Sequence, residues 1–228
     1  MGVLEVNKLI VESKNDKYFV EALINALNLN ELEVDEPLCN VDEYICLDGI
    51  DNLKHKLKDL KLDNIDRLGI ILDADEVGVL KRIEQINKVL KELNINIELE
   101  KINEFRKDKN LDISIACHIL NIDGKGELEN ILKQIAKNDT VFADCLESWK
   151  KCLEDNDKGM SQKDFLKFWV NNYIRFDTCT KEEQKQIGKK CSFQSAMQKD
   201  IWDFEHSVLD SLKKFLQSMK NNEIGNKQ

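Results

Sequence analysis

Acidic residues follow two apolar stretches of the sequence, at points where strands would end. Glu12 comes directly after the stretch 9–11, and Asp73 and Asp75 close the stretch that begins at residue 69. Alternate residues at a strand end point to the same side, so Asp73 and Asp75 can face one cation. Carboxylate oxygens are the ligands that a hard divalent ion such as Mg²⁺ prefers in proteins. The residue types and their spacing therefore predict a magnesium site.

The same acids have a structural alternative. Asp73 and Asp75 would then cap a helix that begins near Val77, because aspartate is common at helix N-termini and in turns. Glu12 and Asp16 would be loop acids, with Asp16 capping the first helix. Spacing alone leaves both interpretations open.

The apolar periodicity around these acids predicts strands that alternate with helices. The expected strands cover 6–12, 43–49, 67–75, 95–101 and 113–120. The expected helices between and after them cover 15–28, 51–62, 76–94 and 126–136. This alternation is typical of an α/β fold with a mostly parallel sheet flanked by helices, and such sheets bind ligands beyond the carboxyl ends of the strands.

Strand patterns stop near residue 140, and helical stretches follow to the end of the chain. We therefore expect an α/β domain over 1–140 and a helical C-terminal subdomain with a polar tail over 141–228. A group of aromatic side chains is expected to pack the core of this helical part rather than to stack on bases. They are Trp149, Phe165, Trp169 and Phe176.

Two motifs resemble the signatures of TOPRIM domains, which occur in topoisomerases, bacterial primases, recombination-mediator proteins and OLD-type nucleases. The first is 9–23 (LIVESKNDKYFVEAL), with a glutamate after a hydrophobic strand and Asp16 opening a helix, and the second is the D-x-D of 69–78 (GIILDADEVG). The resemblance covers about residues 5–132 and implies a TOPRIM-like, Rossmann-like fold. It also implies Mg²⁺- or Mn²⁺-dependent phosphodiester chemistry on DNA or RNA, with Glu12, Asp73 and Asp75 as catalytic residues.

A closer resemblance is to stand-alone TOPRIM-like bacterial proteins of unknown function related to OLD-type nucleases. It is carried by the G-x-L-E at 126–129 and by the W-D-F at 202–204. It implies a second cation site, so that the metal ligands would be Glu12, Asp16, Asp73, Asp75 and Glu129. Ser13 departs from the family, which usually has glycine after the glutamate.

Lys14 lies in the same loop as Glu12 and could reach a phosphate, although lysines on loops are usually solvated. OLD-type relatives pair the TOPRIM domain with an ABC-type ATPase, and this chain has no G-x-x-x-x-G-K-[ST] motif of its own. The resemblance thus implies a nuclease that works with a separate ATPase, as a defence or toxin-like effector. The alternative is a non-catalytic TOPRIM-fold adaptor, which Ser13 and the acidic net charge of −9 favour.

The composition limits where and how the chain works. Seven cysteines without a C-x-x-C pair favour a reducing compartment, and no apolar run is long enough for a membrane span. With no signal-peptide pattern at the start, we expect a cytoplasmic protein without a membrane partner. Cys117 and His118 lie inside an apolar run and are expected to be buried strand residues rather than zinc ligands.

Overall fold

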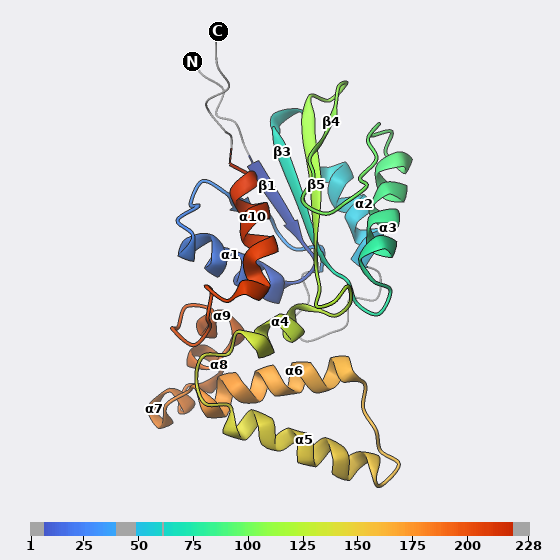
Figure 1. Cartoon of the computed structure of the whole chain (residues 1–228). Coiled ribbons are helices and arrows are strands. Elements are labelled where there is room, and N and C mark those ends of the chain that lie inside the picture. The colour runs from blue at the N-terminus through green and yellow to red at the C-terminus, as the bar shows by residue number, and fades with distance from the viewer. Residues whose placement is uncertain (1–6, 40–48, 61, 221–228) are drawn as a thin grey trace.

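Runs of Ile, Leu and Val form a central sheet in the part of the chain that the structure describes, residues 7–39, 49–60 and 62–220 (Figure 1). In this computed structural model the strand order is β2-β1-β3-β5-β4. The first four of these strands are parallel and β4 is antiparallel to β5. The strands are β1 (Asn7–Val11), β2 (Glu33–Val34), β3 (Arg67–Asp73), β4 (Arg106–Asp108) and β5 (Ile113–Leu120).

Helices cover both faces of the sheet, which confirms the predicted fold class (Figure 1). Successive strand residues point to opposite faces: Leu9 and Val11 belong to one apolar core and Ile10 to the other. Helices α1 and α10 cover the first face, and α2 and α3 cover the second. Their bounds are α1 (Lys14–Ala26), α2 (Gly49–Asp59), α3 (Val79–Glu92) and α10 (Asp210–Ser218), with a 3-10 turn at Leu62–Asn64.

Two of the predicted strands need comment. The one at 43–49 falls on residues 40–48, which lie outside the described part of the chain. The one at 95–101 is wrong, because that segment is not a strand. Side chains take up its backbone groups instead: the Asn87 amide bonds both the N–H and the C=O of Leu99, at 2.9 and 2.8 Å, and Asp108 accepts from the Asn96 N–H at 2.7 Å.

The helical part lies beyond the carboxyl ends of the parallel strands (Figure 1). Phe165 and Trp169 are buried there as predicted, but Trp149 and Phe176 are 39% and 44% exposed, so their assignment to the core is wrong. The elements are α4 (Leu128–Gln134), α5 (Val141–Glu154), α6 (Gln162–Asn172), a π-helix (Tyr173–Asp177), α7 (Lys181–Gln184), α8 (Ile187–Lys190), α9 (Phe193–Ala196) and a 3-10 turn (Ser207–Leu209).

After the helical part, the chain returns to the sheet. Helix α10 packs on β3 at Gly69, where a Cβ atom would lie 2.6 Å from Leu9 and 3.0 Å from Phe215. The Asn7 side chain donates a buried hydrogen bond to the Met219 carbonyl at 2.8 Å. The core on this face therefore joins residues from before and after residue 140.

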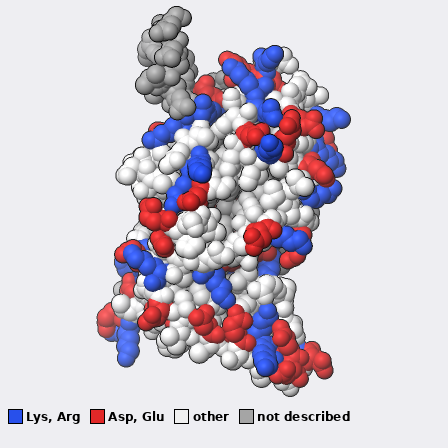
Figure 2. Space-filling view, viewed as in Figure 1, with Lys and Arg blue, Asp and Glu red and all other residues white. Residues whose placement is uncertain are grey.

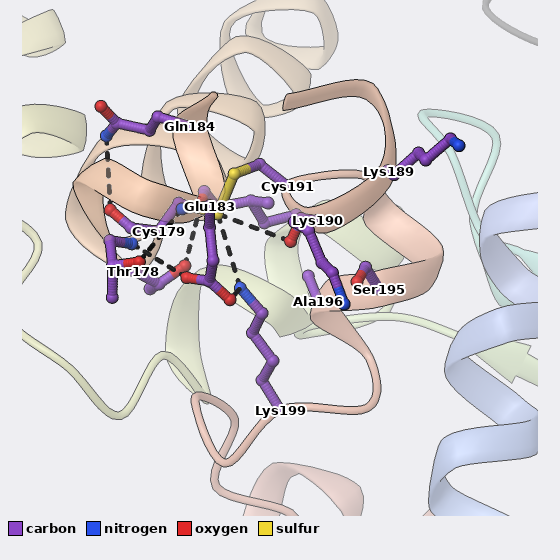
Figure 3. A network of polar contacts seen from close by, with 12 residues as sticks. Thr178, Cys179, Glu183, Gln184, Lys189, Lys190, Cys191, Ser195, Ala196 and Lys199 are labelled. Atoms are coloured by element: carbon purple, nitrogen blue, oxygen red, sulfur yellow. Dashed lines mark hydrogen bonds and ion pairs between the residues drawn. A yellow bond between two sulfur atoms is a disulfide. The ribbon is translucent and has the colours of Figure 1, made fainter. Parts of the chain in front are cut away.

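A disulfide links Cys179 to Cys191 across the short helices α7 and α8 (Figure 3). The Lys199 ammonium lies 3.5 Å from the Cys179 sulfur and pairs with Glu183 at 2.8 Å. The disulfide is not expected from seven cysteines without a C-x-x-C pair, a pattern that favours a reducing compartment. Within the described residues Cys39, Cys117, Cys145 and Cys152 are free.

His118 and Cys117 are buried strand residues, as predicted. Burial lowers the pKa of His118 to about 4 and raises that of Cys117 to about 12, so both are neutral near pH 7. The His118 ring contacts Asn103 at 2.8 Å and stacks on Phe215. In the described part of the chain, helices long and apolar enough to cross a bilayer are absent.

Candidate functional site

The carboxyl ends of β1 and β3 bring the first two predicted acids together. The two strands are parallel neighbours with Val11 opposite Ile71, so Glu12 emerges beside the end of β3. Burial raises the pKa of Glu12, and the Asp73 backbone lies near enough to the Glu12 carboxylate to lower it in part. The parallel register of β1 and β3 therefore places Glu12 next to Asp73.

The loop after Glu12 is built around a helix cap. Ser13 is the N-cap of α1, and its hydroxyl and backbone N–H donate to one Asp16 oxygen at 2.7 and 2.8 Å. Ser13 has an extended backbone, with φ of −128°, so the position does not need glycine. The serine is thus compatible with the loop. The predicted cap is shifted by three residues, because Ser13 is the N-cap and Asp16 completes the capping box from the third helical position, buried next to the other acids.

The second motif is tied to the G-x-L-E segment. Asp75 has a positive φ of 47°, and its backbone exchanges two hydrogen bonds with Gly126, at 2.8 and 3.1 Å. Gly126 has φ of +98°, and a Cβ atom there would lie 2.7 Å from the Asn130 side chain. One step further, the Leu128 N–H donates to an Asp73 carboxylate oxygen at 3.0 Å. Asp73 therefore caps the start of α4, not the helix near Val77.

Two cations hold Asp75. The Arg82 guanidinium pairs with one of its oxygens and donates to the Asp73 carbonyl at 2.9 Å. The Lys163 ammonium, from α6, donates to the other oxygen at 2.8 Å and lies 3.4 Å from Glu127. The expectation that Asp73 and Asp75 jointly face a cation is thus modified, because both Asp75 oxygens already have positive partners.

The remaining acids raise one another's pKa values. Burial, then the charges of Asp16, Glu12, Glu129 and Asp75, raises the pKa of Asp73 well above its usual range. Burial likewise raises the pKa of Asp16 to about 7 and shifts those of Glu12 and Glu129 upward. The other four acids predicted from the sequence therefore lie within electrostatic reach of Asp73.

Sequence reasoning missed three further charged groups, namely Arg82, Glu127 and Lys163. Glu127 is buried; burial, opposed by Lys163, raises its pKa to about 7, and its second carboxylate oxygen has no hydrogen-bond partner among the described residues. Glu127 stands inside the quoted G-x-L-E segment, so attention to its acid pattern could have found it. Lys163 is 88 residues from Asp75 and gives no local signal.

Carboxylates are the ligands that a hard cation prefers, and the acids at this site are all carboxylates. One buried oxygen, on Glu127, has no hydrogen-bond partner among the described residues. As the side chains lie, however, no three acidic, His or Cys side chains of the described residues are placed to hold a metal ion. Arg82 and Lys163 supply the compensating positive charge instead.

A cavity of about 1040 Å³ opens from these acids toward the helical part. Its floor includes Glu12, Asp16 and Asp73, and its opposite wall comes from α6, the π-helix and the segment around Cys191. Lys14 also lines it, so the weak phosphate-binding candidate lies at the same opening. A substrate of several connected groups could reach the acids through this cavity.

Comparison with known proteins gives one family. The model of a protein family of unknown function, DUF3226, matches residues 6–221, and so covers nearly the whole chain. No curated protein and no solved structure matches the chain significantly. The match spans both the strands that carry the acids and the helices that close the cavity, and the chain belongs to the DUF3226 family.

Proposed function

We propose that this chain is a Mg²⁺- or Mn²⁺-dependent phosphodiesterase that cleaves DNA or RNA. The observation that carries the proposal is the convergence of Glu12, Asp16, Asp73 and Glu129 at one end of a cavity, from three separate segments, with Asp75 within electrostatic reach of Asp73. Such a group of buried acids is costly without positive charge. Arg82 and Lys163 pair with Asp75, and bound divalent cations would compensate the other four acids.

The residues have distinct tasks in this proposal. Glu12, Asp73 and Asp75 are the catalytic acids, and Asp16, Glu129 and the unpartnered oxygen of Glu127 complete the set of donors. A bound divalent cation polarises a phosphodiester and lowers the pKa of bound water. Arg82 is a positioning residue, because it fixes both the Asp73 backbone and the Asp75 carboxylate.

The test is cleavage of supercoiled plasmid and of a single-stranded oligonucleotide with Mg²⁺ or Mn²⁺. Wild-type protein is expected to cut, and Asp73→Asn is expected to lose the activity because the central donor loses its charge. Glu76→Gln is the matched control, since Glu76 follows the D-x-D directly but its side chain is 89% exposed. Equal cutting by Asp73→Asn and wild type, or cutting that persists in EDTA, would contradict the proposal.

The second candidate is a non-catalytic adaptor with the same fold. It is favoured by the two ion pairs that neutralise Asp75 and by the lack of a metal-holding arrangement among the described residues. Calorimetric titration with Mn²⁺ separates the candidates. Heat of binding that disappears in Asp73→Asn supports the nuclease, and no binding by wild-type protein supports the adaptor.

The separate ATPase and the defence role stay predictions from the resemblance. Co-purification with the tagged chain from its host would identify an ATPase partner. The cytoplasmic location is also a prediction.

A further inference from the structure

A row of polar and basic side chains lines the wall of the cavity that faces the acids. Lys163, Lys167, Asn171 and Arg175 stand at every fourth position along α6 and the π-helix, and each contributes to the lining. Residues four apart share one face of a helix. The row begins at Lys163, which contacts Asp75, and leads away from the acids toward the open end of the wall.

The outer members of this row are available to a ligand. Lys163 is already paired with Asp75 and Glu127. By contrast, Lys167 and Arg175 form no ion pair in the part of the chain that the structure describes. Lys167 does act on Glu129 at longer range: burial raises the pKa of Glu129, and the charge of Lys167 opposes that rise. Two unpaired cations on one cavity wall are a site for negatively charged groups.

An aromatic ring directly follows each of these cations in the sequence. Phe168 and Phe176 line the same cavity and are 41% and 44% exposed, although large apolar rings gain free energy when buried. Each already packs one edge against a neighbour, Phe168 on Trp149 and Phe176 on Phe142. The rings are thus held in place while part of each surface remains uncovered.

The π-helix that carries Arg175 and Phe176 is held by hydrogen bonds to the start of α5. The Asp177 carboxylate accepts hydrogen bonds from the Phe142 and Ala143 N–H groups, at 2.8 and 2.9 Å, and so caps α5. π-turns of this kind are rare and are found frequently at functional sites. Arg175 and Phe176 are therefore positioned at the cavity before any ligand binds.

We propose that this wall binds single-stranded nucleic acid, with Lys167 and Arg175 on successive phosphates and Phe168 and Phe176 against bases. A positive groove interleaved with aromatic rings is the general means of holding one strand, because phosphates repeat along it and each base offers a flat face. A duplex hides those faces within its stack. An acidic protein segment would use the cations but not the rings.

The charge of the whole chain limits the size of this grip. The net charge is −9, and Figure 2 shows acidic and basic side chains interspersed over the face in view. The binding surface is therefore local and contacts only a few nucleotides of the single strand. The inference deepens the proposed function and rests on it only for where the strand is cut.

The experiment measures binding without chemistry. A fluorescein-labelled oligothymidylate is titrated with the full chain in EDTA, and anisotropy gives the Kd at several salt concentrations. The double variant Lys167→Ala/Arg175→Ala is expected to weaken binding about tenfold and to lower the salt slope by about 1.4, because two phosphate contacts are lost and each contributes about 0.7 on a single strand. Phe176→Ala is expected to weaken binding with the salt slope unchanged.

A matched control removes the same charge elsewhere. Lys151→Ala/Lys181→Ala also deletes two exposed lysines of the helical part, outside the cavity lining, and should keep the wild-type Kd. Equal Kd values for both double variants, or tighter binding of duplex DNA or polyglutamate than of the single strand, would overturn the inference. Cleavage with Mg²⁺ and unaltered binding by the variants would refute this inference alone, whereas binding without any cleavage would refute the proposed nuclease alone.

Discussion

Three acids of the site have a structural task as well as a place in the cluster. Asp16 closes the capping box of α1, Asp73 accepts from the first turn of α4, and Asp75 neutralises Arg82 and Lys163. The capping and metal interpretations of the sequence are therefore compatible, because one carboxylate oxygen can cap while its partner faces the cavity. Glu127 differs from these acids, since one of its oxygens is buried without a hydrogen bond.

Glu127→Gln is expected to change how stability depends on pH. Burial, partly offset by Lys163, raises the pKa of Glu127 from 4.5 to about 7. Between these values the folded protein keeps a proton that the unfolded chain has released, so the free energy of unfolding falls as pH rises through this window. Glutamine does not titrate, so the variant should show a shallower fall. Urea denaturation at a series of pH values measures the slope.

Glu76→Gln serves as the control for this slope, because its exposed side chain lies outside the cluster. The control should follow wild type. Burial also raises the pKa of Asp16 to about 7, so in the Glu127 variant the free energy of unfolding should still fall in part as the pH rises. A slope that is the same in all three proteins would show that Glu127 titrates normally.

At the scale of elements, the strand ends and helix starts that carry the acids were predictable from the sequence. Apolar runs of adequate length located β1, β3 and β5, and the acids at the ends of β1 and β3 marked the site. The segment 95–101 has the same alternation, but Asn87 and Asp108 bond its backbone and no strand forms. Periodicity reports which side chains are buried, whereas the partner of a backbone group depends on the tertiary fold.

Gly69→Val tests the close contact between β3 and α10. The added side chain would meet Leu9, Phe215 and Met219, all fully buried, so the core must shift. Overpacking of this kind costs about 1–3 kcal/mol. Urea denaturation followed by tryptophan fluorescence should show this loss. Gly159→Val, at a glycine with nothing within 4 Å of the added Cβ, should leave the free energy of unfolding near wild type.

At the scale of the whole molecule, the site depends on contacts between distant residues, which no local sequence pattern predicts. Lys163 reaches Asp75 across 88 residues, and the cavity wall with Lys167 and Arg175 exists only because α6 crosses beyond the strand ends. Their position at predicted strand ends found Glu12, Asp73 and Asp75, and the resemblance added Asp16 and Glu129 as metal ligands. The compensating cations come from a part of the chain that was predicted to be helical, with nothing to indicate which face it would present.

The disulfide ties the far wall of that cavity together, and its removal should weaken the whole fold. Cys179 and Cys191 are 12 residues apart, and a loop of about that length contributes roughly 3 kcal/mol by restricting the unfolded chain. Ala196 and Met197, just beyond it, share a core with Leu9 of the sheet, so the loss should appear in global unfolding. Cys179→Ser/Cys191→Ser is therefore expected to unfold at lower urea concentration than wild type.

Cys145→Ser/Cys152→Ser, at two exposed free cysteines, is the matched control and should unfold at the same urea concentration as wild type. With a thiol reductant present, wild type should fall to the level of the first variant; if the two proteins already agree without reductant, the bond does not stabilise this wall.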